Sequence, residues 1–467
     1  MVRMMSNRQV NRPGSRSSHS LKAGIPIMYS KLHLPIIGCL ALLLLCSGCS
    51  FSKDPQSYMR TPRLPENQAS LVQMIQQALP AGASLIRPQV SRDLGSIYMK
   101  DLDGDGMPEA VAFYQTSDKE ARIHGMLWQR SGDVWNQASD FQGEGYELAT
   151  LLFEDVTGDG KLDIIAGYSS GARLNKGLVI YRYDRPKLES VYEAPYAEMA
   201  IDDLNQDGVK DITLVSLDRG TASQAVTLQF DKTFKPLGSV PLDPSINGYE
   251  SLQAGWIAEG KRGLILDYAV GAHSSSTQVL LFQQGELAKA LSDRNIPFKP
   301  RSAFSGDLNH DGIMEIGIDY VPKGSEDEPH VSMPYITAYY RWNGTDGLDP
   351  HPLYERYIDY GNSFYFDIPA EWKDQFKVER FTEDSQPGLR FISQTTGQTL
   401  IEWKNAPAPS EPGEALPEDW KEMGRTAKTV TLVHITADNH VSAGWFHPMS
   451  ELEKQEEPHE QSTHIGG

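Results

Sequence analysis

Cysteine is nearly missing from this sequence of 467 residues: only Cys39, Cys46 and Cys49 occur, all within eleven residues near the N-terminus. The 418 residues after Cys49 contain no cysteine at all. That part of the chain therefore has neither a disulfide framework nor a zinc–thiolate site.

Positive charge is also scarce in the body of the protein. Six of the 43 lysine and arginine residues precede Cys49, in a stretch without a single acidic residue. From Cys49 onward, 37 basic residues face 62 acidic ones, a net charge of −25. Such a surface repels nucleic acid and anionic lipid headgroups and attracts cations, so we expect no nucleic-acid partner.

Long hydrophobic runs are absent apart from Leu34–Leu45, which follows a basic stretch. These twelve residues are too few to span a bilayer as a helix, but they suit the core of a signal peptide. Directly after them, Cys46-Ser47-Gly48-Cys49 resembles the lipobox of bacterial lipoproteins, although Cys46 stands where that motif usually has leucine. The resemblance implies a lipoprotein signal peptide over residues 1–48 and a lipid on Cys49.

The same resemblance predicts that the protein is held at the cell membrane by its lipid, on the extracytoplasmic face. The alternative is an ordinary secretory signal that leaves Cys49 as a free thiol. Met28 offers an internal start that gives a leader of normal length.

An acidic segment of nine residues recurs four times, as Asp101–Glu109, Asp155–Asp163, Asp203–Asp211 and Asp307–Glu315. The starts are 54, 48 and 104 residues apart, and because 104 is about twice the other spacings, a degenerate copy is expected near residue 255. Gly255–Gly263 is that copy, since it keeps a glycine and the following apolar run but has lost most acids. Five units therefore follow one another along the chain.

Short β-branched and aromatic runs flank each acidic segment, so the segment is expected to join two strands as a hairpin. Ala110–Tyr114 and Ile164–Tyr168 are two such runs, and further runs such as Gly177–Tyr181 complete the unit. About four strands in about fifty residues is typical of a β-propeller blade. We expect a mainly β fold, with a β-propeller of about five four-stranded blades over residues 94–350. Whether five blades close the ring, or strands are recruited from elsewhere, stays open.

Within each segment, oxygen-bearing side chains occupy positions 1, 3, 5 and 9, and glycine occupies position 6. Carboxylates that converge on one point repel one another unless a cation neutralises them. A flexible loop with only oxygen donors favours Ca²⁺ over Mg²⁺. An EF-hand is excluded because it needs glutamate at position 12 and flanking helices. Asx-type turns that need no ion are the alternative.

The pattern resembles the FG-GAP/VCBS repeat of integrin-like β-propellers and bacterial surface proteins. The resemblance implies four structural Ca²⁺ sites, in which positions 1, 3, 5 and 9 bind through side chains and position 7 through its carbonyl. Threonine at position 3 of the second set is a weaker donor than aspartate or asparagine, and the degenerate copy is expected to hold no metal. The implied ligands are Asp101, Asp103, Asp105, Met107 and Glu109; Asp155, Thr157, Asp159, Lys161 and Asp163; Asp203, Asn205, Asp207, Val209 and Asp211; and Asp307, Asn309, Asp311, Ile313 and Glu315.

The rest of the chain divides by composition. Residues 49–65 are polar and proline-containing, as in a tether, and residues 66–93 contain a short amphipathic helix and a lead-in. Strand-like runs over 354–447 predict a small α+β domain, with a short helix at Pro417–Met423 and a last strand at Val441–Trp445. Residues 448–467 read as a disordered acidic tail.

No motif for catalysis stands out, because G-x-S-x-G, phosphate-loop and H-E-x-x-H patterns are all missing. His273 beside Ser274–Ser276 is the one nucleophile pair to consider. We therefore expect a non-catalytic, calcium-binding surface protein whose partner is another protein or the cell wall. The alternative is a glycan-binding or glycan-active protein, with Trp128, Trp135, Trp256 and Trp342 as sugar platforms; blade packing is the competing role for these rings.

Overall fold

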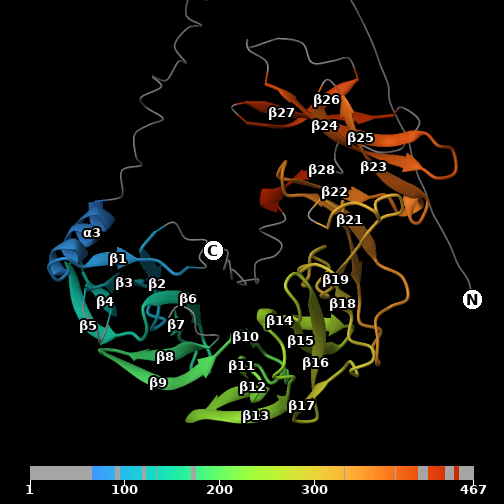
Figure 1. The fold of residues 1–467 in the computed structure, drawn as a ribbon. Coiled ribbons are helices and arrows are strands. Elements are labelled where there is room, and N and C mark those ends of the chain that lie inside the picture. The colour runs from blue at the N-terminus through green and yellow to red at the C-terminus, as the bar shows by residue number, and fades with distance from the viewer. Residues whose placement is uncertain are drawn as a thin grey trace, which may run out of the picture. The chain divides into compact units, whose positions relative to one another are not determined.

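In the computed structural model, the short apolar runs of the sequence form antiparallel strands, and the fold is mainly β as predicted (Figure 1). The structure describes residues 66–89, 95–117, 122–132, 134–169, 175–330, 332–383, 385–408, 419–426, 428–436 and 446–451. The signal peptide, Cys49 and the tether lie outside these residues. Among the helices that are described, none has the length and apolar character needed to cross a membrane.

The chain divides into two compact units, Met1–Val72 and Gln73–Gly467. The helix expected before residue 80 is present as α3 (Glu66–Ala78), which runs across the division between the units. All the strands among the described residues belong to the second unit.

The described residues form six antiparallel sheets, which we number in chain order. Each of the first three contains one acidic segment, which joins two of its paired strands. Sheet 1 contains β1 (Ser84–Ile86), β2 (Ile97–Lys100), β3 (Glu109–Gln115), β4 (Ile123–Ser131) and β5 (Val134–Gln142). Sheet 2 contains β6 (Glu147–Glu154), β7 (Asp163–Ser169), β8 (Lys176–Asp184) and β9 (Lys187–Tyr196). Sheet 3 contains β10 (Glu198–Asp202), β11 (Asp211–Asp218), β12 (Ala222–Asp231) and β13 (Thr233–Pro241).

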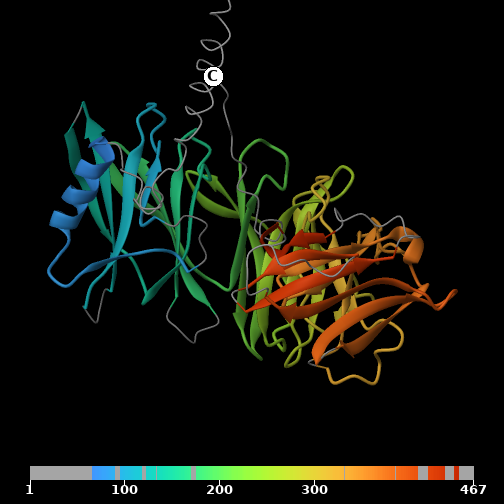
Figure 2. The same ribbon diagram turned by 90° about the horizontal axis from the view of Figure 1, so that it is seen from above.

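The later sheets take strands from further along the chain. Sheet 4 contains β14 (Gly248–Ala258), β15 (Lys261–Ala269), β16 (Ser275–Gln283), β17 (Glu286–Lys289) and β18 (Phe298–Lys299). Sheet 5 contains β19 (Ile316–Tyr320), β20 (Ile336–Tyr340), β21 (Tyr354–Asp359), β22 (Phe364–Ile368) and β28 (Phe446–Pro448). Sheet 6 contains β23 (Phe376–Glu383), β24 (Gln386–Ser393), β25 (Thr399–Pro407), β26 (Trp420–Arg425) and β27 (Thr429–Ile435), side by side in Figure 2.

Consecutive sheets share their hydrophobic cores. Phe113 of sheet 1 lies in one buried cluster with Ile164 of sheet 2, and Ile165 of sheet 2 lies in another with Ile212 of sheet 3. Three further clusters join sheets 3 and 4, sheets 4 and 5, and sheets 5 and 6. Sheets 2 to 5 therefore each bury apolar side chains on both faces, as their nearly continuous apolar strands require.

Three expectations for the C-terminal part need correction. The boundary between residues 350 and 354 falls inside sheet 5, because β21 pairs with β20 and not with sheet 6. The segment that includes Pro417–Met423 forms strand β26 from Trp420 onward, because it adds to the edge strand β27 instead of coiling. Pro448, expected to open a disordered tail, pairs with Phe364. The predicted strand Val441–Trp445 and residues 452–467 lie outside the described residues.

Candidate metal centre

The four acidic segments lie at equivalent hairpin turns, as predicted; we call them loop 1 (101–109), loop 2 (155–163), loop 3 (203–211) and loop 4 (307–315). In loops 1 to 3, the residue before position 1 pairs with position 9 across the hairpin. In loop 4, a bridge between Gly306 and Glu315 does the same. The degenerate copy differs, because Ala258 pairs with Lys261 and a two-residue turn replaces the loop.

The same backbone hydrogen bonds hold all four loops. The carboxylate at position 1 accepts a hydrogen bond from the glycine N–H at position 6, at 2.8–3.0 Å. The carboxylate at position 5 accepts one from the N–H of position 7, and the carboxylate at position 9 accepts one from the N–H of position 2. The Asx-type turns considered from the sequence are thus present in all four loops.

Position 4 adds a requirement that sequence reasoning missed. It has positive φ in every loop, on Gly104, Gly158, Gln206 and His310, at 60–74°. Only glycine takes this conformation without strain, so the two longer residues are held there by the loop. The signal was available, because two of the four copies have glycine at this position.

The acid at position 9 is buried in every loop, with an exposure of 1% or less. Burial raises the pKa of Asp163 to about 6 and the pKa values of Asp211 and Glu315 to about 7, because an ionised carboxylate is poorly solvated there. Burial also raises the pKa of Glu109. A cation beside these buried carboxylates would favour their ionised form.

Loops 2 and 3 present such carboxylates without a side-chain cation. In the part of the chain that the structure describes, no lysine or arginine pairs with an acid of either loop. Asp211 Oδ1 is buried and has no hydrogen-bond partner, while Asp211 Oδ2 accepts from Leu204 N–H at 3.0 Å. Asp163 Oδ1 receives only a long contact of 3.4 Å from Thr157 Oγ1. The oxygen-only donor set and the free buried oxygens fit Ca²⁺.

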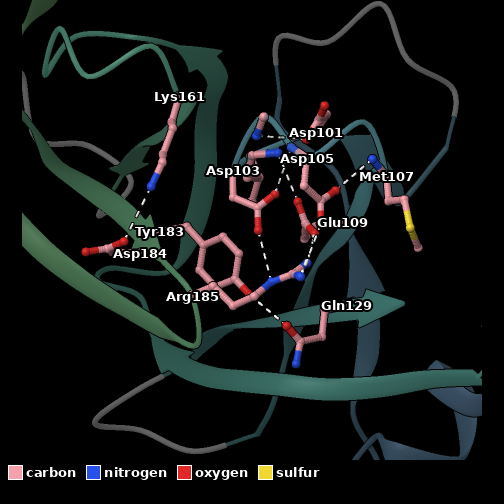
Figure 3. A network of polar contacts seen from close by, with 12 residues as sticks. Asp101, Asp103, Asp105, Met107, Glu109, Gln129, Lys161, Tyr183, Asp184 and Arg185 are labelled. Atoms are coloured by element: carbon pink, nitrogen blue, oxygen red, sulfur yellow. Dashed lines mark hydrogen bonds and ion pairs between the residues drawn. The ribbon is translucent and has the colours of Figure 1, made fainter. Parts of the chain in front are cut away.

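Loop 1 is different, because the Arg185 guanidinium lies among its acids (Figure 3). Arg185 comes from the turn between β8 and β9 of sheet 2. Its three nitrogens lie 2.9 Å from Asp103 Oδ2, 3.1 Å from Asp105 Oδ2 and 3.2 Å from Glu109 Oε1. One oxygen each of Asp101, Asp103 and Glu109 also lie within 4.8 Å of one another.

Loop 4 receives an arginine from its own sheet. Arg341 directly follows β20, and its terminal nitrogen contacts Asp311 and lies 3.3 Å from Glu315 Oε1. Asp307 Oδ1 remains buried without a hydrogen-bond partner. The four predicted ligand sets therefore share one backbone frame but differ in the cation that reaches them.

Three of the four tryptophans considered as sugar platforms are too buried to stack on a sugar. Trp128, Trp135 and Trp342 are 4–5% exposed and belong to the interior, which confirms blade packing as their role. The Arg262 guanidinium lies over the ring of Trp256 at 4.9 Å.

Among the described residues, no hydrogen bond joins His273 to Ser274, Ser275 or Ser276. His273 lies beside the ring of His330, 6.1 Å away, and Ser275 and Ser276 are buried in strand β16.

A cavity of about 350 Å³, lined by both polar and aromatic residues, lies between loop 4 and the outer strands of sheet 5. Arg356 donates from Nε to Asp367 Oδ1 at 2.7 Å, and its guanidinium stacks 4.1 Å from the Tyr365 ring. The His447 ring also stacks on Tyr365, with ring centroids 4.8 Å apart. His447 Nδ1 lies 3.1 Å from Glu451 Oε2. Sequence reasoning missed this cavity, because its residues are scattered over loop 4, β21, β22 and the region around β28.

No protein-family model matches the chain, and no curated protein matches it. Among solved structures it is similar to rhamnogalacturonan lyase YesW, with 12% identity over 65% of this chain and 67% of that one, at a TM-score of 0.32. The Bacillus licheniformis rhamnogalacturonan lyase is 11% identical over 69% of this chain and 64% of that one, at a TM-score of 0.32. A protein from Lactobacillus plantarum is 8% identical over 62% of this chain and 94% of that one, at a TM-score of 0.30. Likenesses this distant carry no argument about activity.

Proposed function

We propose that the protein is a non-catalytic β-propeller of the FG-GAP/VCBS kind, stabilised by Ca²⁺ and anchored through Cys49 outside the cytoplasmic membrane. There it binds a protein or cell-wall partner. The observation that carries the proposal is the recurrence of one acidic hairpin loop in four sheets, each with a fully buried carboxylate at position 9.

Calcium has a structural role in this proposal. A bound ion neutralises the acids of the loop, and the residues of loops 2 and 3 would hold it. The chain's own contribution is the backbone frame, in which glycine N–H groups orient the position 1 carboxylate. The hairpin, and with it the edge of the sheet, is then fixed in one conformation.

The experiment is a thermal melt of the full chain with 5 mM Ca²⁺, with 5 mM Mg²⁺ and with EDTA. Extracellular modules bind Ca²⁺ with Kd values of roughly 10⁻⁴ to 10⁻³ M, so each occupied loop should add about 1 to 2 kcal/mol at this concentration. A rise in Tm with Ca²⁺ that Mg²⁺ does not reproduce supports the proposal. Equal Tm values in all three buffers would refute the calcium part of the proposal.

The anchor has a separate test. In the producing cell, the wild-type chain is expected in the membrane fraction and Cys49→Ser in the soluble extracytoplasmic fraction, with Cys46→Ser as the matched control. Equal partition of the wild type and Cys49→Ser would leave only the secretory-signal alternative.

Glycan binding is the second candidate, and the cavity beside loop 4 favours it. Arg356, Asp367 and His447 line this cavity with planar polar groups, which suit the hydroxyls of a sugar. A glycan array with the wild type and with Asp367→Asn decides this point. Binding that Asp367→Asn loses supports the candidate, and an empty array removes it.

A further inference from the structure

Two of the four acidic loops already contain a cation that belongs to the chain. We propose that Arg185 and Arg341 are the resident cations of loops 1 and 4, so that calcium binding is confined to loops 2 and 3. This inference rests on the proposed function, because it divides the four predicted calcium loops into two kinds.

The oxygens that Arg185 contacts are those an ion would use. In loop 1, backbone N–H groups bond to Asp103 Oδ1, Asp105 Oδ1 and Glu109 Oε2. Arg185 takes the other oxygen of each of these carboxylates, at 2.9–3.2 Å. Every carboxylate in this set is thus shared between the loop backbone and the guanidinium, and a metal ion would have to displace the arginine.

Guanidinium is suited to this position. It is planar, stays charged and presents several N–H donors in a fixed fork, so it bonds to three carboxylates at once where an ammonium acts as a point charge. Arg185 stands on sheet 2 while its acceptors stand on sheet 1, so the contact also joins the two sheets. A calcium ion held within loop 1 alone would not make that link.

Loop 4 repeats the division of oxygens. Ile313 N–H bonds to Asp311 Oδ1 and Leu308 N–H bonds to Glu315 Oε2, while Arg341 contacts Asp311 Oδ2 and Glu315 Oε1. The two arginines come from different places, one from the next sheet and one from the strand beside the loop. The same oxygens are therefore neutralised by two unrelated side chains.

In loop 3, the oxygen equivalent to the one that Arg185 and Arg341 take from position 9 has no partner. Asp211 Oδ1 is fully buried and accepts no hydrogen bond. In loop 2, Asp163 Oδ1 receives only the 3.4 Å contact from a neutral hydroxyl. Nearby lysines are directed elsewhere, because Lys161 pairs with Asp184 and Lys210 with Glu154. These two loops keep the need for an external cation.

The test counts bound Ca²⁺ per full chain by equilibrium dialysis with radioactive Ca²⁺. The wild type is expected to bind two ions, and Arg185→Gln and Arg341→Gln three each. The control is Lys187→Gln, which removes a positive charge at the start of β9, two residues from Arg185. Lys187 contacts Glu189, so this variant should keep two ions. Arg185→Lys retains the charge at loop 1 and is also expected to bind two.

A second set of variants serves if the arginine variants do not fold. Asp163→Asn and Asp211→Asn should each lower the count by one, and Glu109→Gln should leave it at two. Four ions in the wild type would refute the inference and leave the calcium proposal intact. No ions in any chain would refute both.

Discussion

Replacement of Asp211 by asparagine probes the unpaired buried oxygen of loop 3. Burial raises the pKa of Asp211 from 3.8 to about 7. Each pKa unit corresponds to about 1.4 kcal/mol, so at pH 8 the ionised carboxylate costs the ion-free fold about 4 kcal/mol. Asparagine cannot ionise and keeps an oxygen for the Leu204 N–H. Its buried amide N–H groups have no partner and offset about 1 to 3 kcal/mol of this cost, so Asp211→Asn is expected to raise the free energy of unfolding in EDTA by about 1 to 3 kcal/mol.

The same substitution removes a calcium ligand. The increment that 5 mM Ca²⁺ adds to the free energy of unfolding should fall by about 1 to 2 kcal/mol, the share of one site. Urea unfolding followed by tryptophan fluorescence, at pH 8 with EDTA or Ca²⁺, measures both effects. Asp231→Asn is the matched control, because Asp231 is exposed in the same sheet and pairs only with Lys235. Destabilisation of Asp211→Asn in EDTA, or an unchanged calcium increment, would refute the reasoning.

Two further predictions follow from buried charges. Asp163, Asp211 and Glu315 have folded pKa values of about 6, 7 and 7, above their ordinary values of 3.8, 3.8 and 4.5. Between about pH 4 and 7 the ion-free folded chain therefore binds more protons than the unfolded chain. Its free energy of unfolding in EDTA should fall as pH rises through this range. A free energy of unfolding that rises across this range would contradict the assignment. Lys299 is fully buried, and its Nζ lies 2.7 Å from Asp267 Oδ1. Lys299→Ala should lower the free energy of unfolding in urea by about 3 to 5 kcal/mol, and the double variant Lys299→Met with Asp267→Leu should recover most of this loss. A loss below about 1 kcal/mol for Lys299→Ala would contradict this account.

Local patterns in the sequence were enough to predict most of the repeat. The β-branched runs and the regular spacing placed the hairpins of all four acidic loops, because strand formation and turn formation depend on neighbouring residues. The C-terminal boundary could not be found in this way. β21 begins at Tyr354 beyond the last acidic loop, and its pairing with β20 shows that it belongs to sheet 5.

The candidate site likewise has a part that could be predicted from local sequence and a part that could not. The ligand positions of each loop follow from the spacing of its own acids. The cations of loops 1 and 4 do not, because Arg185 lies 76 residues from Glu109 in sequence and Arg341 lies 26 residues from Glu315. The burial of position 9, which raises its pKa, also depends on how neighbouring sheets pack, and no local pattern reports that.

The most direct measurement is a crystal structure of the protein grown with Ca²⁺, with an anomalous difference map. The account predicts one peak in loop 2 and one in loop 3, each about 2.3–2.6 Å from the carboxylate oxygens of positions 1, 5 and 9. It also predicts the guanidinium groups of Arg185 and Arg341 in loops 1 and 4, without a peak. Empty loops 2 and 3 would contradict the central claim that the protein is stabilised by calcium.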